Sequence, residues 1–404
     1  MGKSVPQSDF KSVPLQSASI KEDKALYTQY HLQHFATGKI SECFGPDFKI
    51  YDTRTAPRTP NGDLQLTTRV IEVNGKKNEF SKPAYCIAEY EVPENVWYYK
   101  NNSHPGVMPY SIIMEIALQP CGFISACMGT TLISPDTDFY FRNLDGEGTV
   151  LRDIDLRGKT ITNKSTLLNT MAMGNTIIQT FEFNMKVDDM DYYKGTASFG
   201  YFVASALEDQ VGLDKGIDNH PMTEKKYLNG RDITLIDLAS DEARQKFYAT
   251  NLKKPHYRLT DPQLDFLSKV QIVKGGGSDD LGYIYADRPI NRSDWFFDCH
   301  FFEDPVMPGS LGVESVFQAL QVFALEEDLG SKFNSPRFTQ IEDKIIWKYR
   351  GQISPEIDAM AIEVHITGII KTDDKVTVKG RASLWKDKIR IYEVKQIALV
   401  IEES

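Results

Sequence analysis

The residues best suited to chemistry lie in one segment, from Trp295 to Gln318. It contains His300 and, eight residues later, a Pro308-Gly309 pair that stands where a loop enters a predicted helix. The first N–H groups of a helix have no internal partner and carry the positive end of its dipole. Glycine lets a ligand approach that backbone closely. The Gly309 amide is therefore a candidate for stabilising a carbonyl oxygen that gains negative charge.

Two glutamates lie on otherwise apolar predicted helices. Glu314 and Gln318 are four residues apart and so share one helix face, and Glu115 and Gln119 do the same. A buried carboxyl group has a raised pKa and can remain protonated near neutral pH, ready to donate a proton. A lone histidine is more often a satisfied core or surface residue than a catalyst, whereas a buried unpaired carboxylate is costly and therefore more informative.

The chain contains an internal duplication. Val107-Met108-Pro109 returns 199 residues later as Val306-Met307-Pro308. At the same displacement Glu115 matches Glu314, Gln119 matches Gln318 and Tyr193 matches Tyr392, while Trp97-Tyr98-Tyr99 matches Trp295-Phe296-Phe297 at 198. Two copies of a long repeat are not a solenoid. The pattern predicts two fused homologous domains around a pseudo-twofold axis.

Each copy has one long helix that is apolar on every side, at 110–128 and 310–325, among segments of alternating polarity. Such a helix belongs inside a fold, so we expect an α+β architecture in which each sheet wraps around a central helix. The predicted organisation is an N-terminal arm (1–24), a first domain (25–205), a polar linker (206–262) and a second domain (263–404). A short helix is expected over 24–43. Strands are expected at 64–73, 84–92, 176–187, 195–203, 264–273, 282–286, 343–349, 359–369, 375–385 and 389–401.

Composition excludes several classes of protein. The 404 residues carry a net charge of −10, which leaves no basic surplus for general binding to nucleic acid or an anionic membrane. The apolar runs are too short to predict membrane insertion, and we expect a cytoplasmic protein. The five cysteines (Cys43, Cys86, Cys121, Cys127 and Cys299) are scattered without a CxxC pair, and no cluster of metal ligands is seen.

The run Trp-Phe-Phe-x-Cys-His-Phe-x-x-Asp-Pro-Val-Met-Pro-Gly-x-Leu-Gly at 295–312 resembles the active-site segment of the β-hydroxydecanoyl-ACP dehydratase/isomerase family. The resemblance implies a hotdog fold, with the catalytic histidine in the loop before the central helix and the carboxylate on the helix of the other subunit. Residues 260–404 cover one hotdog, and 25–205 resemble a degenerate second. The tandem order, with Tyr193-Lys-Gly-Thr-Ala-Ser-Phe-Gly-Tyr and Gln210-Val-Gly-Leu-Asp, is similar to the dehydratase region of polyunsaturated fatty acid synthases.

Carried over residue by residue, the resemblance makes His300 the acid/base, Gly309 the oxyanion-binding amide, and Glu314 or Glu115 the carboxylate. Glutamate departs from the aspartate of the nearest relatives, although related dehydratases without isomerase activity use glutamate. In the first copy the histidine position falls on Asn101 or Asn102, and Tyr110 replaces the glycine, while His104 is out of register. The competent site is therefore expected to combine His300, Gly309, Glu115 and an orienting Gln119. A vestigial second site retains Glu314, Gln318 and Asn102.

The predicted reaction is dehydration of 3-hydroxyacyl thioesters on an acyl carrier protein to 2-enoyl thioesters, in fatty acid biosynthesis of the polyunsaturated type, with double-bond isomerisation left open. No metal or organic cofactor is expected beyond the carrier's phosphopantetheine. Partners would be the carrier protein and other synthase domains, with the chain a monomeric pseudo-dimer or a dimer of these. The alternatives are a hotdog acyl thioesterase and a catalytically silent carrier-docking module.

Overall fold

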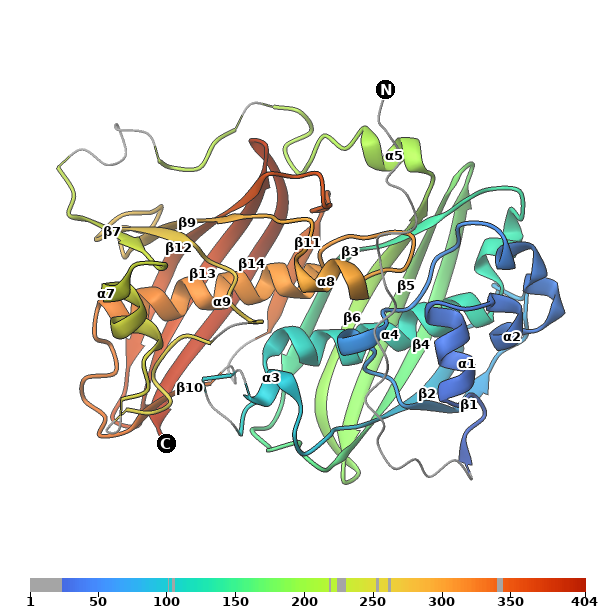
Figure 1. Cartoon of the computed structure of the whole chain (residues 1–404), viewed down its shortest axis with the longest axis horizontal. Coiled ribbons are helices and arrows are strands. Elements are labelled where there is room, and N and C mark those ends of the chain that lie inside the picture. Colours follow the sequence, from blue (N-terminus) through green and yellow to red (C-terminus); the bar gives the residue numbers. More distant parts are fainter. Residues whose placement is uncertain are drawn as a thin grey trace.

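The computed structural model describes residues 24–100, 102–103, 106–217, 219–223, 230–251, 254–260, 263–339 and 344–404. Two long helices, α4 (Tyr110–Cys127) and α9 (Gly309–Glu326), each lie along the concave side of a curved antiparallel sheet (Figure 1). Almost every residue of both helices is buried, as their all-round apolar sequences predict. The predicted α+β fold of two fused hotdogs is confirmed.

The first copy begins with short helices and then builds its sheet. Its elements in chain order are α1 (Gln29–Ala36), α2 (Ile40–Phe44), η2 (Pro46–Asp52), η3 (Gly62–Leu64), β1 (Arg69–Asn74), β2 (Ala84–Glu91), α3 (Trp97–Lys100), α4, η4 (Thr130–Ile133), β3 (Tyr140–Val150), β4 (Thr160–Met173), β5 (Thr176–Val187) and β6 (Met190–Phe202). The helix expected over 24–43 is thus two helices. They are interrupted at Thr37-Gly38, where the Gly38 amide bonds back to the last turn of α1.

The second copy repeats this plan after a connecting stretch. That stretch contains α5 (Ala204–Glu208), β7 (Ile233–Asp237), α7 (Asp241–Ala243) and η5 (Arg244–Tyr248). The copy itself comprises β8 (Lys269–Val273), β9 (Tyr283–Pro289), α8 (Trp295–Cys299), α9, β10 (Pro336–Thr339), β11 (Ile345–Tyr349), β12 (Ala359–Lys371), β13 (Lys375–Lys386) and β14 (Ile389–Glu403).

The two sheets join into one. Strand β3 of the first copy pairs antiparallel with β11 of the second, giving the order β1-β2-β4-β5-β6-β3-β11-β14-β13-β12-β9-β8-β7. The equivalent Trp97 and Trp295 meet ring to ring with centroids 5.0 Å apart, which places the pseudo-twofold axis between them. Helices α4 and α9 also contact one another, so the copies share one continuous core.

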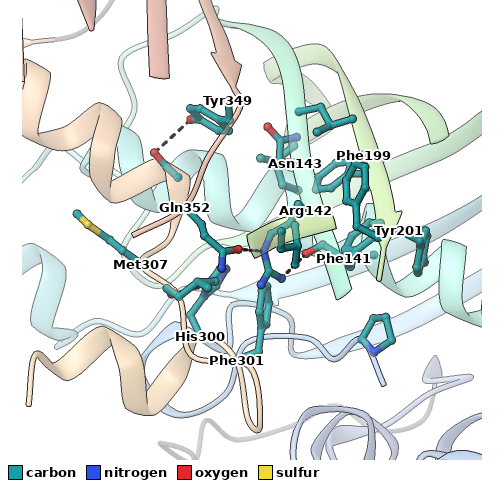
Figure 2. A pocket seen from close by; sticks show the side chains of 18 of the residues that line it. Phe141, Arg142, Asn143, Phe199, Tyr201, His300, Phe301, Met307, Tyr349 and Gln352 are labelled. Atoms are coloured by element: carbon teal, nitrogen blue, oxygen red, sulfur yellow. Dashed lines mark hydrogen bonds between the residues drawn. The ribbon is translucent and has the colours of Figure 1, made fainter. Parts of the chain in front are cut away.

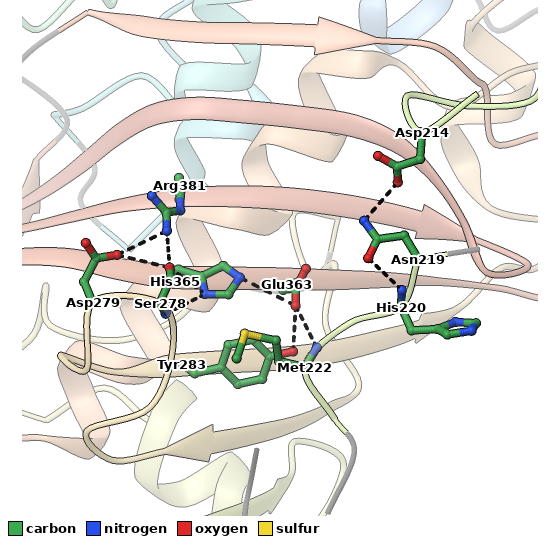
Figure 3. Close-up of polar contacts among 10 residues, drawn as sticks. All are labelled: Asp214, Asn219, His220, Met222, Ser278, Asp279, Tyr283, Glu363, His365 and Arg381. Carbon is green, nitrogen blue, oxygen red and sulfur yellow. Dashed lines mark hydrogen bonds and ion pairs between the residues drawn. The ribbon is translucent and has the colours of Figure 1, made fainter. Parts of the chain in front are cut away.

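The segment predicted as a plain linker, 206–262, needs correction. Strand β7 pairs with β8 and extends the second sheet. Earlier in the segment Asp214 forms an ion pair with Arg390 of β14, and the Met222 amide donates to Glu363 of β12 at 2.9 Å (Figure 3). These contacts hold the described parts of the segment against the second sheet. The predicted arm, apart from Lys24, and the Asn101 and His104 positions lie outside the described residues.

Within the described residues, one stretch, Tyr110–Ile133, is long and apolar enough to cross a membrane by length and composition. It contains α4, and 83% of its most apolar window is buried inside the protein. Its hydrophobicity is accounted for by its place inside the sheet.

The seam between β3 and β11 generates a prediction. Gly146 pairs with Trp347, and a Cβ added at Gly146 would lie 2.2 Å from Trp347 Cζ2. We expect Gly146→Ala to lower the free energy of unfolding by about 1–3 kcal/mol, because overpacking shifts the indole and the strand. Thermal unfolding measures the effect. Gly368→Ala in β12 is the control, since its Cβ would meet nothing nearer than 3.8 Å. Equal melting temperatures for the two variants would contradict the tight seam.

Candidate active site between the two copies

One cavity of about 380 Å³ brings together residues that the sequence places far apart. His300, at the end of α8, and Gly309, the first residue of α9, come from the second copy. Glu115 and Gln119 come from α4 of the first copy. Figure 2 shows His300 and Met307 on one side of this cavity, facing Phe141 and Phe199 on strands of the first copy. The cavity therefore contains the four residues that the sequence predicts for the competent site.

His300 is held in a defined tautomer. Its Nδ1 lies 3.0 Å from the Val306 carbonyl oxygen, which can only accept, so Nδ1 carries the proton and Nε2 keeps its lone pair. The Val306 amide donates to the His300 carbonyl at 2.8 Å, which closes the loop on itself. Burial lowers the pKa of His300 to about 3, with a further lowering by the charge of Arg142 that the Val306 bond opposes. The imidazole is therefore neutral near neutral pH.

Arg142 braces the histidine loop from the other copy. Its guanidinium donates to both carboxylate oxygens of Asp304 at 2.6 Å. Through Nε it also donates to Gln352 at 2.8 Å (Figure 2). Such a bidentate pair fixes geometry as well as charge. Sequence reasoning did not single out Arg142, because its strand β3 has only one buried residue and shows no apolar alternation.

Glu115 is 6% exposed, and its carboxyl group is bonded from both copies. Ser310 Oγ, in the first turn of α9, donates to Oε1 at 2.7 Å, and Gln119 Nε2 donates to Oε2 at 3.2 Å. Burial raises the pKa of Glu115, and these two bonds partly oppose the rise. Ser310 thus links the second helix to the carboxyl group of the first, a contact that the sequence alone does not reveal.

Gln119 is fixed by the backbone next to the helix. The Leu66 amide donates to its Oε1 at 3.0 Å, and its Nε2 donates to the Leu64 carbonyl at 2.8 Å. The Leu66 bond identifies the amide oxygen and directs the NH₂ group toward Glu115. The equivalent Gln318 makes the same pair of contacts, accepting from the Phe266 amide and donating to the Leu264 carbonyl. The glutamines therefore anchor one loop in each copy, and only Gln119 lines the cavity.

The reciprocal site is closed. Glu314 is 2% exposed, accepts a long 3.4 Å bond from the Ser111 amide, and does not line the cavity that holds His300. Its pKa is raised by burial. Tyr110, at the position of Gly309, packs against Phe317 with ring centroids 5.5 Å apart and fills the corresponding space. This half of the molecule therefore retains a buried carboxyl group, with Tyr110 where the other half has Gly309.

Asn102 takes the structural place of the histidine in the first copy. Its Nδ2 donates to the Val107 carbonyl at 2.6 Å, as His300 Nδ1 does to Val306. Asn102, one of the two positions predicted to replace the histidine, therefore makes the same hydrogen bond as His300. An amide can reproduce the loop-closing bond but cannot accept and return a proton near neutral pH.

The described ranges contain no group of three or more His, Cys, Asp or Glu side chains arranged to hold a metal.

Comparison with known proteins shows what this chain is similar to. Residues 259–395 match the family of FabA-like domains. The chain is 37% identical over 385 residues to one of the subunits of a polyunsaturated fatty acid synthase from Thraustochytrium sp.. That match covers 93% of this chain and 26% of the relative, so the chain spans about a quarter of the relative's length.

Solved structures with a similar fold share little sequence. The dehydratase domain from the CurJ module of curacin polyketide synthase is 12% identical, with a TM-score of 0.43, over 82% of this chain and 95% of the other. A putative oleoyl thioesterase from Lactobacillus plantarum is 11% identical, with a TM-score of 0.42, over 78% and 95%. These similarities do not decide between dehydration and thioester hydrolysis.

The depressed pKa of His300 predicts a specific acid sensitivity. The unfolded histidine takes up a proton below pH 6.5 and the folded one only near 3, so its contribution to stability is lost as pH falls through that window. His300→Asn, which copies Asn102, removes this loss. Between pH 7 and pH 4 the wild-type free energy of unfolding should fall by up to about 3 kcal/mol more than that of the variant. Urea titration at both pH values measures this, and parallel losses in the two proteins would show that His300 titrates normally.

Proposed function

We propose that this chain dehydrates 3-hydroxyacyl groups, carried as thioesters on an acyl carrier protein, in fatty acid synthesis of the polyunsaturated type. One observation carries the proposal: a single cavity receives a neutral histidine from one copy and a buried, protonatable carboxyl group from the other. Elimination of water needs this combination of a base and an acid. The FabA-like match and the similarity to part of a polyunsaturated fatty acid synthase support the same reaction.

The base in this proposal is His300. Its Nε2 lone pair removes the proton on C2 of the acyl group while Nδ1–H remains bonded to Val306. The hydrogen bond from Nδ1–H to the Val306 carbonyl oxygen stabilises the imidazolium that forms. The positive charge of Arg142 repels that cation and lowers the pKa of His300 further, so the resting histidine is neutral. Asp304, bonded to Arg142, offsets part of this repulsion.

The thioester oxygen faces the first turn of α9. Gly309 begins that helix, and a Cβ there would lie 2.6 Å from Tyr349 Cε2, so the position accepts no larger residue without rearrangement. The Tyr349 hydroxyl donates to the Gly309 carbonyl at 3.1 Å and fixes the turn. Negative charge that develops on the thioester oxygen as the proton leaves is stabilised by the amide and the helix dipole.

The acid is Glu115. In its protonated form it donates to the hydroxyl on C3, the C3–O bond breaks, and water leaves as the C2–C3 double bond forms. Gln119 and Ser310 orient the carboxyl group and stabilise the carboxylate that remains. The step leaves His300 with one extra proton and Glu115 with one fewer, and exchange with solvent restores both. No redox change occurs, because the C2 proton passes to His300 and the proton of Glu115 leaves in the water.

The first test is turnover itself. Purified protein is incubated with a 3-hydroxyacyl thioester on carrier protein or a pantetheine mimic, and mass spectrometry follows loss of one water. We expect conversion by the wild type and a fall in kcat of about 10²–10⁴-fold for His300→Ala. Nuclear magnetic resonance of the product reads the position of the double bond. Release of free thiol instead of water would identify a thioesterase, and carrier binding without turnover would identify a silent docking module.

The asymmetry of the two carboxyl groups gives a sharper prediction. Glu115→Gln should lower kcat by about 10²-fold or more, because the amide is a far weaker acid than a carboxyl group. Glu314→Gln is the matched control on the equivalent helix position and should change kcat by less than about twofold, since its side chain is remote from the cavity. Steady-state kinetics on the same substrate measures both. Equal losses from the two variants would contradict a single working site per chain.

A further inference from the structure

One short turn of the first copy lies between the proposed acid and the proposed base. This turn, η3, directly follows Asn61 and contacts α8 of the second copy, the helix that ends immediately before His300. Asn61 is 1% exposed and does not line the cavity that holds His300. Whatever Asn61 contributes to the site must therefore act through the residues that it holds.

Asn61 caps the end of α8 from the other copy. Its backbone amide donates to the Cys299 carbonyl at 2.9 Å, and its Nδ2 donates to the same carbonyl at 3.0 Å and to the Asp298 carbonyl at 3.2 Å. The last carbonyls of a helix have no partner within it and need donors from elsewhere. The Cys299 thiol in turn accepts hydrogen bonds from backbone amides of η3. The residue before His300 is thus held by the first copy at both its carbonyl and its side chain.

The same turn also holds the glutamine that orients the carboxyl group. Gln119 Nε2 donates to the Leu64 carbonyl at 2.8 Å and to Glu115 at 3.2 Å. The Leu64 amide donates to the Asn61 carbonyl at 3.1 Å, which closes the turn. A continuous series of buried hydrogen bonds therefore leads from Glu115 through Gln119 and η3 to the residue before His300.

We propose that η3 is the spacer that fixes the separation between Glu115 and His300, and that Asn61 is its positioning residue. The inference rests on the proposed dehydratase function and adds to that site a residue that does not touch the substrate. A planar amide that donates to two successive carbonyls sets both the distance and the rotation of the last turn of α8. Loss of this amide should therefore slow the chemical step and leave substrate binding largely unchanged.

Steady-state kinetics compares wild type, Asn61→Ala and the control Thr260→Val. Thr260 is 2% exposed, lies in the corresponding stretch of the second copy, and donates to the Leu264 carbonyl at 3.2 Å. Asn61→Ala should lower kcat by about 10²-fold and leave KM within about threefold, because a displacement of about 1 Å in a reacting group has that effect. Thr260→Val should leave both constants within about twofold of wild type.

An unchanged kcat in Asn61→Ala, or equal losses from Asn61→Ala and Thr260→Val, would overturn the inference. Melting temperatures establish that each variant is folded. If Asn61→Ala does not fold, Asn61→Ser takes its place, because the serine hydroxyl is too short to bond both carbonyls of α8 and disturbs the packing less.

A double-mutant cycle tests whether Asn61 and Gln119 act through one connection. If both hold the same separation, Asn61→Ala combined with Gln119→Ala should lower kcat by clearly less than the product of the two single losses, since the separation is lost only once. A loss in the double variant equal to that product would show two independent effects and would overturn the spacer.

Hydrogen exchange separates this inference from the proposed reaction. Mass spectrometry follows exchange in peptides that cover residues 295–308. Asn61→Ala should speed this exchange by about tenfold or more, because α8 loses its cap, and Thr260→Val should leave it as in wild type. Faster exchange in Asn61→Ala, with no dehydration even by the wild type, would support the cap and reject the proposed reaction. Dehydration by the wild type with unchanged exchange in Asn61→Ala would reject the cap and leave the reaction in place.

Discussion

The structure depends on one contact that neither copy can make alone: the carboxyl group of Glu115 buried against the first turn of the other copy's helix. A carboxyl group in an apolar interior must be neutral or well bonded, because an isolated buried charge is costly. Here Ser310 supplies a bond from across the pseudo-twofold axis and Gln119 supplies one from the same helix. The two helices must therefore meet at a fixed distance and rotation.

The continuous sheet fixes that distance. Strands β3 and β11 pair at the seam, and Gly146 leaves just enough room for the Trp347 indole, whose Nε1 donates to Asn143 at 2.8 Å. The same strand β3 carries Arg142, which reaches across to Asp304 in the histidine loop. A displacement of the seam would therefore move His300 relative to Glu115, the proposed base and acid. A small displacement of either group from its reacting position lowers the catalytic rate strongly.

The central helices and the duplication could be predicted because each leaves a local signal in the sequence. His300, Gly309, Glu115 and Gln119 line one cavity, and their catalytic roles stay predictions. Helices α4 and α9 are apolar on every side, and Glu115 and Glu314 stand out on them as buried carboxyl groups. Strands β3 and β4 were not predicted. β3 is partly exposed along most of its length, and the second half of β4 is largely exposed, so neither shows the alternation of a half-buried strand. The contacts of Arg142 with Asp304 and of Ser310 with Glu115 join the two copies across the pseudo-twofold axis, so no local sequence pattern indicates them.

The two copies have diverged in complementary directions, and the physical reason is visible at matched positions. Asn102 preserves the bond that closes the loop at Val107, so the first copy keeps its fold while losing the proton-transfer group. Tyr110 packs against Phe317 of the opposite helix, and Glu314, three residues before Phe317, is 2% exposed. In the proposed reaction one site needs a base from one copy and an acid from the other, so a chain with a single histidine loop still holds one complete pair.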